Sequence, residues 1–360
     1  MTAQQTEGPL RIVLIGGGTG LSTLLGGLKV FARPVSWTEP PSLAAEFPIV
    51  DLAAIVTVSD DGGSSGRLRR DFKVLPPGDI RNCMVALSED EALLSRLFRY
   101  RFARGKGLKG HSFGNLFLTA LTKITGDFAR AVRVSCEVLA IKGRIYPSTA
   151  ANVTLEAELE DGRMVLGETK ISRSRLRIRR IRLSPPHAEP LEETLRAIAE
   201  ADAITLGPGS LFTSIIPNLL VDGIPQAIAE SRAVKACFVN LMWQPGETVR
   251  FTAADHVDAI HKHAGRPLLD YVVVNTRAID PAVLKVYARQ NARPVENDLE
   301  RLHAMGLKIV GRDLAQAGDK IRHDPAAAAA VAIELAADGR RRRNTGNEDD
   351  GTAAGVREKI

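Results

Sequence analysis

The sequence is poor in the residue types on which several classes of protein depend. Only three of its 360 residues are cysteines, and Cys83, Cys136 and Cys237 stand far apart in no CxxC spacing, so neither a disulfide framework nor a zinc site is indicated. Aromatic residues make up 5% of the chain, which leaves few stacking platforms for nucleic acid. No apolar run approaches the ~20 residues that span a bilayer, and the N-terminus lacks the basic start and long apolar core of a signal peptide. We therefore expect a cytoplasmic protein with no transmembrane segment and no nucleic-acid partner.

The charges and the polar C-terminal end of the chain indicate the kind of ligand and the extent of the folded domain. Forty-eight lysines and arginines face 42 acids, for a net charge of +6. Much of this excess is local, in Arg173 to Arg182 and in Arg340 to Arg343, and we expect it to serve anionic small molecules or a surface. Residues 339–360 are polar and lack apolar periodicity, which predicts a disordered tail. Residues 1–338 are then expected to form a single domain.

A strand, a glycine loop and a helix follow one another near the N-terminus. Leu10–Ile15 is an apolar, β-branched run, typical of a strand buried on both faces of a parallel sheet. It runs into Gly16–Gly20, and leucines at helical spacing follow. Backbone N–H groups and a helix N-terminus converge on an anion in such an arrangement. The loop lacks the third glycine of G-x-G-x-x-G and the lysine of a Walker A loop, so it predicts an anion site without naming a nucleotide. A tight turn without a ligand is the alternative.

Two further buried strands end in loops of the same kind. Leu52–Val58 is followed by the sequence SDDGGSSG, which contains Asp60 and Asp61, and Ala203–Leu206 is followed by Gly207–Ser210. Ligands bind outside the carboxyl ends of the strands in open α/β sheets, so these loops are expected to face the first one. The two acids are suited to accept hydrogen bonds from a ribose or to hold a cation. A helix N-cap is the alternative for them, and a plain turn is the alternative for the last loop.

Polar residues also mark two predicted helices between these loops. Asp79 stands at the start of one, with Arg81 and Asn82 in its first turn. His111 and Asn115 are four residues apart and would share one face of a helix. Contact with a ligand and a purely structural role are both open for His111.

Residues 152–183 interrupt the alternation of strands and helices. Apolar residues alternate with Glu156 and Glu158, Asp161-Gly162 is a hairpin signal, and Met164–Ile171 is the predicted returning strand. A last strand is predicted at Leu176–Leu183. We interpret the segment as a small antiparallel hairpin insertion in an α/β protein, peripheral to the cleft.

Together these stretches resemble one family. The motifs that carry the resemblance are IVLIGGGTGLSTLL, VTVSDDGGSSGRLR, LPPGDIRNCMVALS, GHSFGNL, ADAITLGPGSLFTSIIPNLL and NLMWQPGET. They are similar to the YvcK-type gluconeogenesis factors, the bacterial branch of a family that also contains the CofD-type 2-phospho-L-lactate transferases. The similarity runs in order from about Leu10 to about Pro325. It implies a Rossmann-like, doubly wound, mainly parallel sheet that binds a nucleotide-bearing ligand.

The two branches of that family imply different functions. In the YvcK-like branch the ligand is understood as a UDP-sugar, notably UDP-N-acetylglucosamine, with a role in cell shape and envelope synthesis on gluconeogenic carbon sources. A protein of cell-envelope synthesis is then a candidate partner, and a homodimer is compatible with the sequence. In the transferase branch a phospholactyl group leaves a nucleotide carrier with magnesium present. The resemblance also implies sugar-nucleotide contacts for Tyr287 in KVYAR and Arg322 in KIRHD.

We therefore expect a nucleotide-sugar-binding regulator, with a magnesium-dependent transferase as the alternative. No nucleophile with an adjacent base is evident, so the catalytic residues are left open. No cofactor is firmly implied, and Asp60 and Asp61 are the metal ligands only if a magnesium site exists. The imperfect fingerprint argues against a nicotinamide oxidoreductase. The residues expected at the ligand are Gly16, Gly17, Gly18, Thr19, Gly20, Asp60, Asp61, Gly62, Ser64, Ser65, Asp79, Asn82, His111, Asn115, Gly207, Gly209, Ser210, Tyr287 and Arg322.

Overall fold

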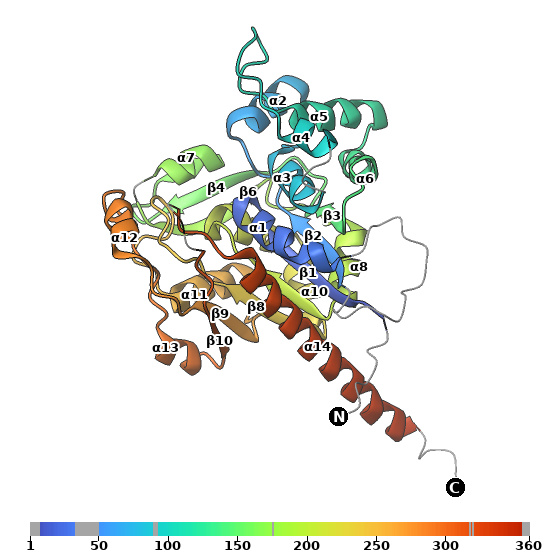
Figure 1. The fold of residues 1–360 in the computed structure, drawn as a ribbon, viewed down its shortest axis with the longest axis vertical. Helices are drawn as coiled ribbons and strands as arrows, with labels where there is room; N and C mark the ends of the chain where they lie inside the picture. Colours follow the sequence, from blue (N-terminus) through green and yellow to red (C-terminus); the bar gives the residue numbers. More distant parts are fainter. Residues whose placement is uncertain are drawn as a thin grey trace.

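The computed structural model describes residues 8–32, 50–88, 93–174, 176–316, 318 and 320–354, and it describes side chains as far as Thr345. A seven-stranded parallel sheet runs through the molecule (Figure 1) in the order β10-β9-β8-β7-β1-β2-β3. Its strands are β1 (Leu10–Gly16), β2 (Val50–Val56), β3 (Arg144–Pro147), β7 (Ala203–Leu206), β8 (Val234–Phe238), β9 (Tyr271–Asn275) and β10 (Lys308–Arg312).

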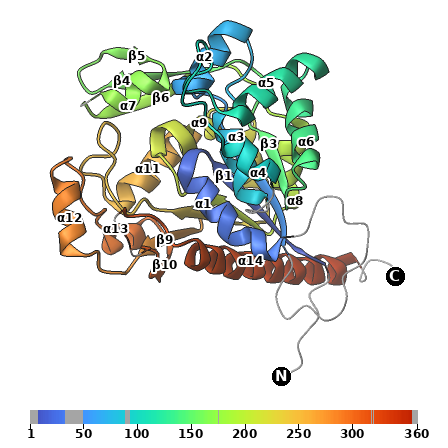
Figure 2. The same ribbon diagram turned by 45° about the horizontal axis from the view of Figure 1, so that its top comes forward.

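Helices cover both faces of this sheet, which is why its central strands are almost continuously apolar. One face is covered by α1 (Gly18–Leu28), α3 (Gly78–Leu87) and α14 (Pro325–Ala354), which pack side by side (Figure 2). The other face carries a second packed group of helices, namely α8 (Glu192–Glu200), α9 (Ile216–Leu219), α10 (Ile224–Glu230) and α11 (Ala253–Ala264). The sheet is therefore doubly wound and Rossmann-like, and the expected fold class is confirmed.

The direction of winding reverses between two neighbouring strands. From β1 the chain moves outward through β2 to β3, and from β7 it moves the opposite way through β8 and β9 to β10. The chain leaves β1 and β7 toward opposite faces of the sheet at this point. The crevice at the carboxyl ends of these two strands is the usual ligand position in such sheets. The loops after both strands are among the glycine loops singled out in the sequence.

Outside the antiparallel insertion, six further α-helices are described. They are α2 (Gly63–Phe72), α4 (Leu93–Arg99), α5 (Phe113–Thr125), α6 (Phe128–Val138), α12 (Pro281–Ala288) and α13 (Leu299–Ala304), together with a 3₁₀ turn at Lys29–Phe31 and a π-helix at Leu211–Ile215. Within the described residues no single helix has the length and apolar character to cross a membrane. The bent pair Leu211–Leu219 and Ile224–Glu230 passes that test only when the two are taken together.

The antiparallel insertion is present, but it differs from the expected form. β4 (Thr154–Leu159) pairs with β5 (Met164–Leu166) and with β6 (Ile178–Ser184). The predicted strand Met164–Ile171 is wrong beyond Leu166, because the chain turns at Gly167 with a φ of +97° and enters α7 (Glu168–Arg173). A side chain could not stand there, since a Cβ on Gly167 would lie 2.2 Å from Asp61 Oδ2.

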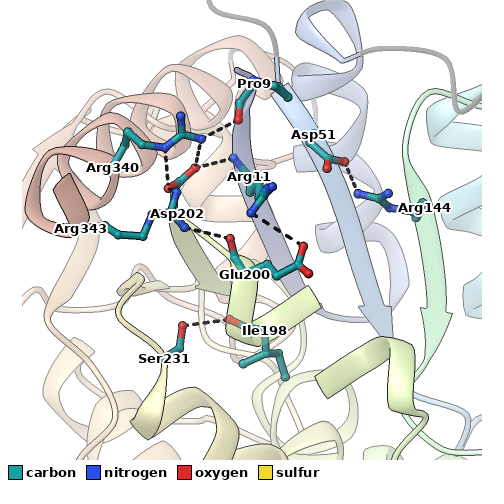
Figure 3. Close-up of polar contacts among 10 residues, drawn as sticks. All are labelled: Pro9, Arg11, Asp51, Arg144, Ile198, Glu200, Asp202, Ser231, Arg340 and Arg343. Atoms are coloured by element: carbon teal, nitrogen blue, oxygen red, sulfur yellow. Dashed lines mark hydrogen bonds and ion pairs between the residues drawn. The ribbon is translucent and has the colours of Figure 1, made fainter. Parts of the chain in front are cut away.

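The expectation of a disordered tail from Gly339 is also wrong for the described residues, because α14 continues to Ala354. The part of α14 that follows Gly339 is held on the sheet by ion pairs rather than by an apolar stripe (Figure 3). Arg340 donates from Nε to Asp202 Oδ1 at 2.9 Å and from Nη2 to Oδ2 at 2.7 Å, and Arg343 binds the same carboxylate. Asp202 also accepts a hydrogen bond from the backbone N–H of Arg11 at 2.8 Å. Residues 355–360 lie outside the described residues, and the expectation of a single domain stays a prediction.

Candidate functional site

The loops after β1 and β7 meet at the carboxyl edge of the sheet. Both line a cleft of about 630 Å³, to which Gly17–Gly20, Gly209 and Ser210 contribute. Their backbones touch, since a Cβ on Gly20 would lie 2.4 Å from the carbonyl oxygen of Pro208. This close approach explains the glycine at position 20. Gly16 is the last residue of β1 and Gly207 directly follows β7, and neither lines the cleft.

The opposite wall of the cleft comes from the second half of the chain. Tyr287 and Arg322, for which the resemblance implies sugar-nucleotide contacts, both line it. The Tyr287 hydroxyl accepts a hydrogen bond from the backbone N–H of Ile321 at 3.0 Å, so the tyrosine holds the segment that carries Arg322. Gln244 donates to the Ser210 hydroxyl at 2.8 Å and ties the far wall to the loop after β7. Eight of the predicted residues thus surround one cavity, namely Gly17, Gly18, Thr19, Gly20, Gly209, Ser210, Tyr287 and Arg322.

A carboxylate already lies at the N-terminus of α1. Asp79 accepts a hydrogen bond from the backbone N–H of Gly18, and its burial together with the nearby charge of Asp60 raises the pKa of Asp79 to about 7. A Cβ on Gly17 would lie 2.6 Å from Asp79 Oδ2. One of the helix N–H groups predicted to face a ligand anion therefore has an acceptor within the protein.

Two more carboxylates near the cleft were not among the expected residues. Burial, together with the negative charges of Asp60, Asp79, Glu247 and Asp61, raises the pKa of Glu168 to about 9. Burial raises the pKa of Glu247 to about 7, although hydrogen bonds from Thr213, the Phe212 N–H and Ser172 oppose the shift. Glu247 lies in the motif NLMWQPGET, which is a usable signal. No such signal marks Glu168 in the sequence, because its segment resembles a strand.

The two acids of the second glycine loop face different neighbours. Asp60 Oδ1 accepts the Gly62 N–H at 2.8 Å in an Asx turn, and Gly62 rather than an acid is the N-cap of α2. Asp61 Oδ1 accepts hydrogen bonds from the backbone N–H and the hydroxyl of Thr169, at 2.8 and 2.6 Å. Asp61 therefore fastens α7 of the insertion to the edge of the cleft, and Ser172 of that helix lines the cavity. The insertion is thus not wholly peripheral, because α7 reaches the site.

The described residues contain no group of three or more histidine, cysteine or acidic side chains placed to hold a metal ion. Asp61 Oδ1 already has two donors, so the pair Asp60 and Asp61 offers fewer open oxygens than the sequence suggested. Magnesium at these acids stays a prediction.

The remaining predicted residues form a polar cluster where α2, α3 and α5 begin. The Ser64 hydroxyl and His111 Nδ1 are 2.9 Å apart, and the Asn115 amide donates to the Ser65 hydroxyl at 3.5 Å. Burial and the charge of Arg67 lower the pKa of His111. His111 precedes α5 instead of sharing a helix face with Asn115, because Ser112 caps that helix by accepting the Asn115 N–H at 3.2 Å.

Within the same cluster Asn82 accepts a hydrogen bond from Arg81 Nη2 at 2.6 Å. None of Ser64, Ser65, Asn82, His111 and Asn115 lines the 630 Å³ cleft. The structure thus brings the predicted residues together as two groups, with Asp79 between them. The pairing of a serine with a histidine was not evident in the sequence, where 47 residues separate the two.

Comparison of the chain with known proteins identifies its family. The sequence model of the family described as 2-phospho-L-lactate transferase CofD matches residues 12–315. The chain belongs to the CofD family. This CofD-family protein is 47% identical over 327 residues to the gluconeogenesis factor of Bacillus subtilis, a match that covers 90% of this chain and 98% of the relative. It is 45% identical over 324 residues to the gluconeogenesis factor of Halalkalibacterium halodurans, covering 90% and 95% of the two chains.

A solved structure agrees with the fold. A crystal structure of a protein from Bacillus halodurans superposes with a TM-score of 0.84 at 43% identity, and covers 91% of this chain and 100% of the other. A second crystal structure, described as a member of the UPF0052 family, superposes with a TM-score of 0.82. The family expected from the motifs is therefore confirmed, and within the CofD family this protein groups with the gluconeogenesis factors.

Proposed function

We propose that this CofD-family protein is a cytoplasmic regulator that binds a UDP-sugar, UDP-N-acetylglucosamine in particular, and that supports cell shape and envelope synthesis on gluconeogenic carbon sources. The observation that carries the proposal is the convergence of two glycine loops with Tyr287 and Arg322 around one cleft of about 630 Å³. Clefts of roughly 300–1,000 Å³ suit ligands of this size. A protein of envelope synthesis as partner and a homodimer are part of the same proposal.

The parts of the ligand match different walls of the cleft. Backbone N–H groups at Thr19, Gly20 and Gly209, with the guanidinium of Arg322, suit a diphosphate. The Tyr287 ring suits the face of a base. The Glu247 carboxylate in the wall of the cleft suits ribose or sugar hydroxyls, which donate hydrogen bonds.

A magnesium-dependent transferase is the second candidate, because specific contacts favour it. The charge of Asp60 raises the pKa of Asp79, and the charges of Asp60 and Asp79 raise that of Glu168. Carboxylates gathered in this way are the setting in which a bridging cation stabilises a transferring phosphate. Ser64 and His111 have the spacing of a hydroxyl with its base. The regulator is preferred because neither group lines the cleft that holds Tyr287 and Arg322.

A thermal-shift panel tests the proposal. UDP-N-acetylglucosamine should raise the melting temperature in proportion to RT ln(1 + [L]/Kd), because it binds the native state alone. Arg322→Ala should remove most of the shift, whereas Arg289→Ala, an exposed arginine that does not line the cleft, should keep it. No shift with UDP-N-acetylglucosamine, UDP-glucose or UDP, beside a clear shift with NAD, would refute the proposal.

A further inference from the structure

We infer that the loop between α4 and α5, together with the adjoining ends of α2 and α4, is a docking surface for an anionic phospholipid bilayer. This inference does not rest on the proposed ligand. The loop projects at the top of the molecule in Figure 1, beside α2, α4 and α5. Arg67 on α2 donates to the Lys109 carbonyl oxygen at 2.9 Å, so loop and helix form one surface. We call it the basic surface, and its exposed cations are Arg70, Lys73, Arg96, Arg99, Arg101, Arg104, Lys106 and Lys109.

The segments that carry the basic surface have a net charge equal to that of the whole chain. Residues 93–110 contain six cations and no acid, and residues 67–73 contain four cations and one acid. The three acids at 89–91 precede α4 in the sequence and lie outside the described residues. With these acids counted, residues 67–73 and 88–110 carry ten cations and four acids, a net of +6, which equals the net charge of the entire protein. The other 330 residues are therefore balanced.

The cations of this surface are little used within the protein. The ion pairs recorded elsewhere on the molecule, such as Arg301 with Asp255, have no counterpart here among the described residues, Arg99 aside. Among the residues that the structure describes, the Arg101 side chain donates to the Gly110 carbonyl oxygen and not to an acid. Unpaired charge of one sign on an exposed loop attracts a polyanion and is screened by salt.

Apolar side chains are exposed on the same elements. Of the thirteen large apolar side chains exposed among the described residues, six belong to these segments. Leu93 is 75% exposed and Tyr100 is 53% exposed, and the other four are Phe72, Leu94, Leu97 and Leu108. Exposed leucines and aromatic rings among lysines and arginines enter the interface of a bilayer, where the cations meet lipid phosphates.

The combination of cations with exposed leucines favours a bilayer over other polyanions. Nucleic acid is held by stacking on aromatic rings, and four of the six apolar side chains here are leucines. The loop projects from the molecule (Figure 1), with turns at Gly105, Gly107 and Gly110, all of which have positive φ. It therefore presents a projection rather than a groove for a folded acidic partner. A bilayer surface requires no groove.

Vesicle sedimentation tests the inference with the full chain. The protein should sediment with phosphatidylglycerol-containing vesicles and not with pure phosphatidylcholine vesicles, and it should dissociate as salt rises from about 0.05 M to about 0.5 M. The double variant Arg104→Glu, Lys106→Glu should lose at least about tenfold in partitioning, because each lost cation weakens binding. The double variant Leu93→Ser, Leu108→Ser should lose severalfold at unchanged charge.

The control is a charge-matched pair on another face, Arg180→Glu with Arg266→Glu, both exposed, which should bind vesicles like the wild type. Unchanged melting temperatures would show that each variant is folded, whether or not any nucleotide binds. Equal binding to neutral vesicles, an equal loss in the control pair, or displacement from vesicles by stoichiometric poly(U) would overturn the inference, the last in favour of nucleic acid.

Discussion

Carboxylates at the two edges of the parallel sheet have opposite electrostatic surroundings. At the amino edge the Asp202 side chain is fully buried, and both of its oxygens meet arginine donors (Figure 3). At the carboxyl edge the half-buried Asp79 meets one backbone N–H and the negative charge of Asp60. Charge at the amino edge therefore holds α14 on the sheet. Charge at the carboxyl edge opposes folding, which is the mark of a site kept for a ligand.

The largest effect is expected at the amino edge. Asp202→Ala leaves Arg340 buried without its carboxylate, and breaking such a pair costs about 3–5 kcal/mol of unfolding free energy. Urea denaturation measures the loss. Asp338→Ala is the matched control, because Asp338 pairs with the more exposed Arg341 and Arg342 and should cost about 1 kcal/mol or less. Similar losses in both variants would show that the amino edge is not a clamp.

An intermediate effect is expected where the two glycine loops touch. Gly20→Ala places a Cβ 2.4 Å from the Pro208 carbonyl oxygen, and such overpacking costs about 1–3 kcal/mol. The loops must separate, so affinity for UDP-N-acetylglucosamine should fall by about tenfold or more. Gly26→Ala in the same helix has nothing within 4 Å of its Cβ and should leave affinity unchanged, as calorimetry can check. Equal affinity in both variants would show that the loop after β1 is a plain turn that does not contact the ligand.

A smaller effect of opposite sign is expected for two carboxylates beside the cleft. The pKa of Asp79 is about 7 and that of Glu168 about 9 in the folded protein, above their unfolded values near 4. The folded state therefore binds more protons, and the free energy of unfolding should fall as the pH rises from about 4 to about 9. Asp79→Asn should then stabilise the protein at pH 8, by about 1–2 kcal/mol, and Glu168→Gln should flatten the pH dependence. Stability that rises over this range would contradict the contrast between the edges.

The sequence predicts the carboxyl edge better than the amino edge. Buried parallel strands are continuous apolar runs, so β1 and β7 and their glycine loops were evident, and the alternation of elements gave the fold class. Asp202 is a lone acid before a strand, and its partner Arg340 is 138 residues away, so only the fold reveals the pair. Glu168 was missed because three residues of real strand precede it. The arginine runs at Arg173–Arg182 and Arg340–Arg343 are the conspicuous basic stretches of the sequence. The run at residues 93–110 is less dense in cations, but it also contains no acid.

The central claim is that the cleft binds a UDP-sugar without consuming it. Calorimetry of the wild type with UDP-N-acetylglucosamine, once in magnesium and once in EDTA, with mass spectrometry of the ligand afterwards, tests this claim most directly. The account predicts the same dissociation constant in both solutions and an intact ligand, with Asp60→Asn weakening binding only modestly, because an amide oxygen still accepts a hydrogen bond. Consumption of the ligand that requires magnesium and disappears in Asp60→Asn would contradict it and make the protein a transferase.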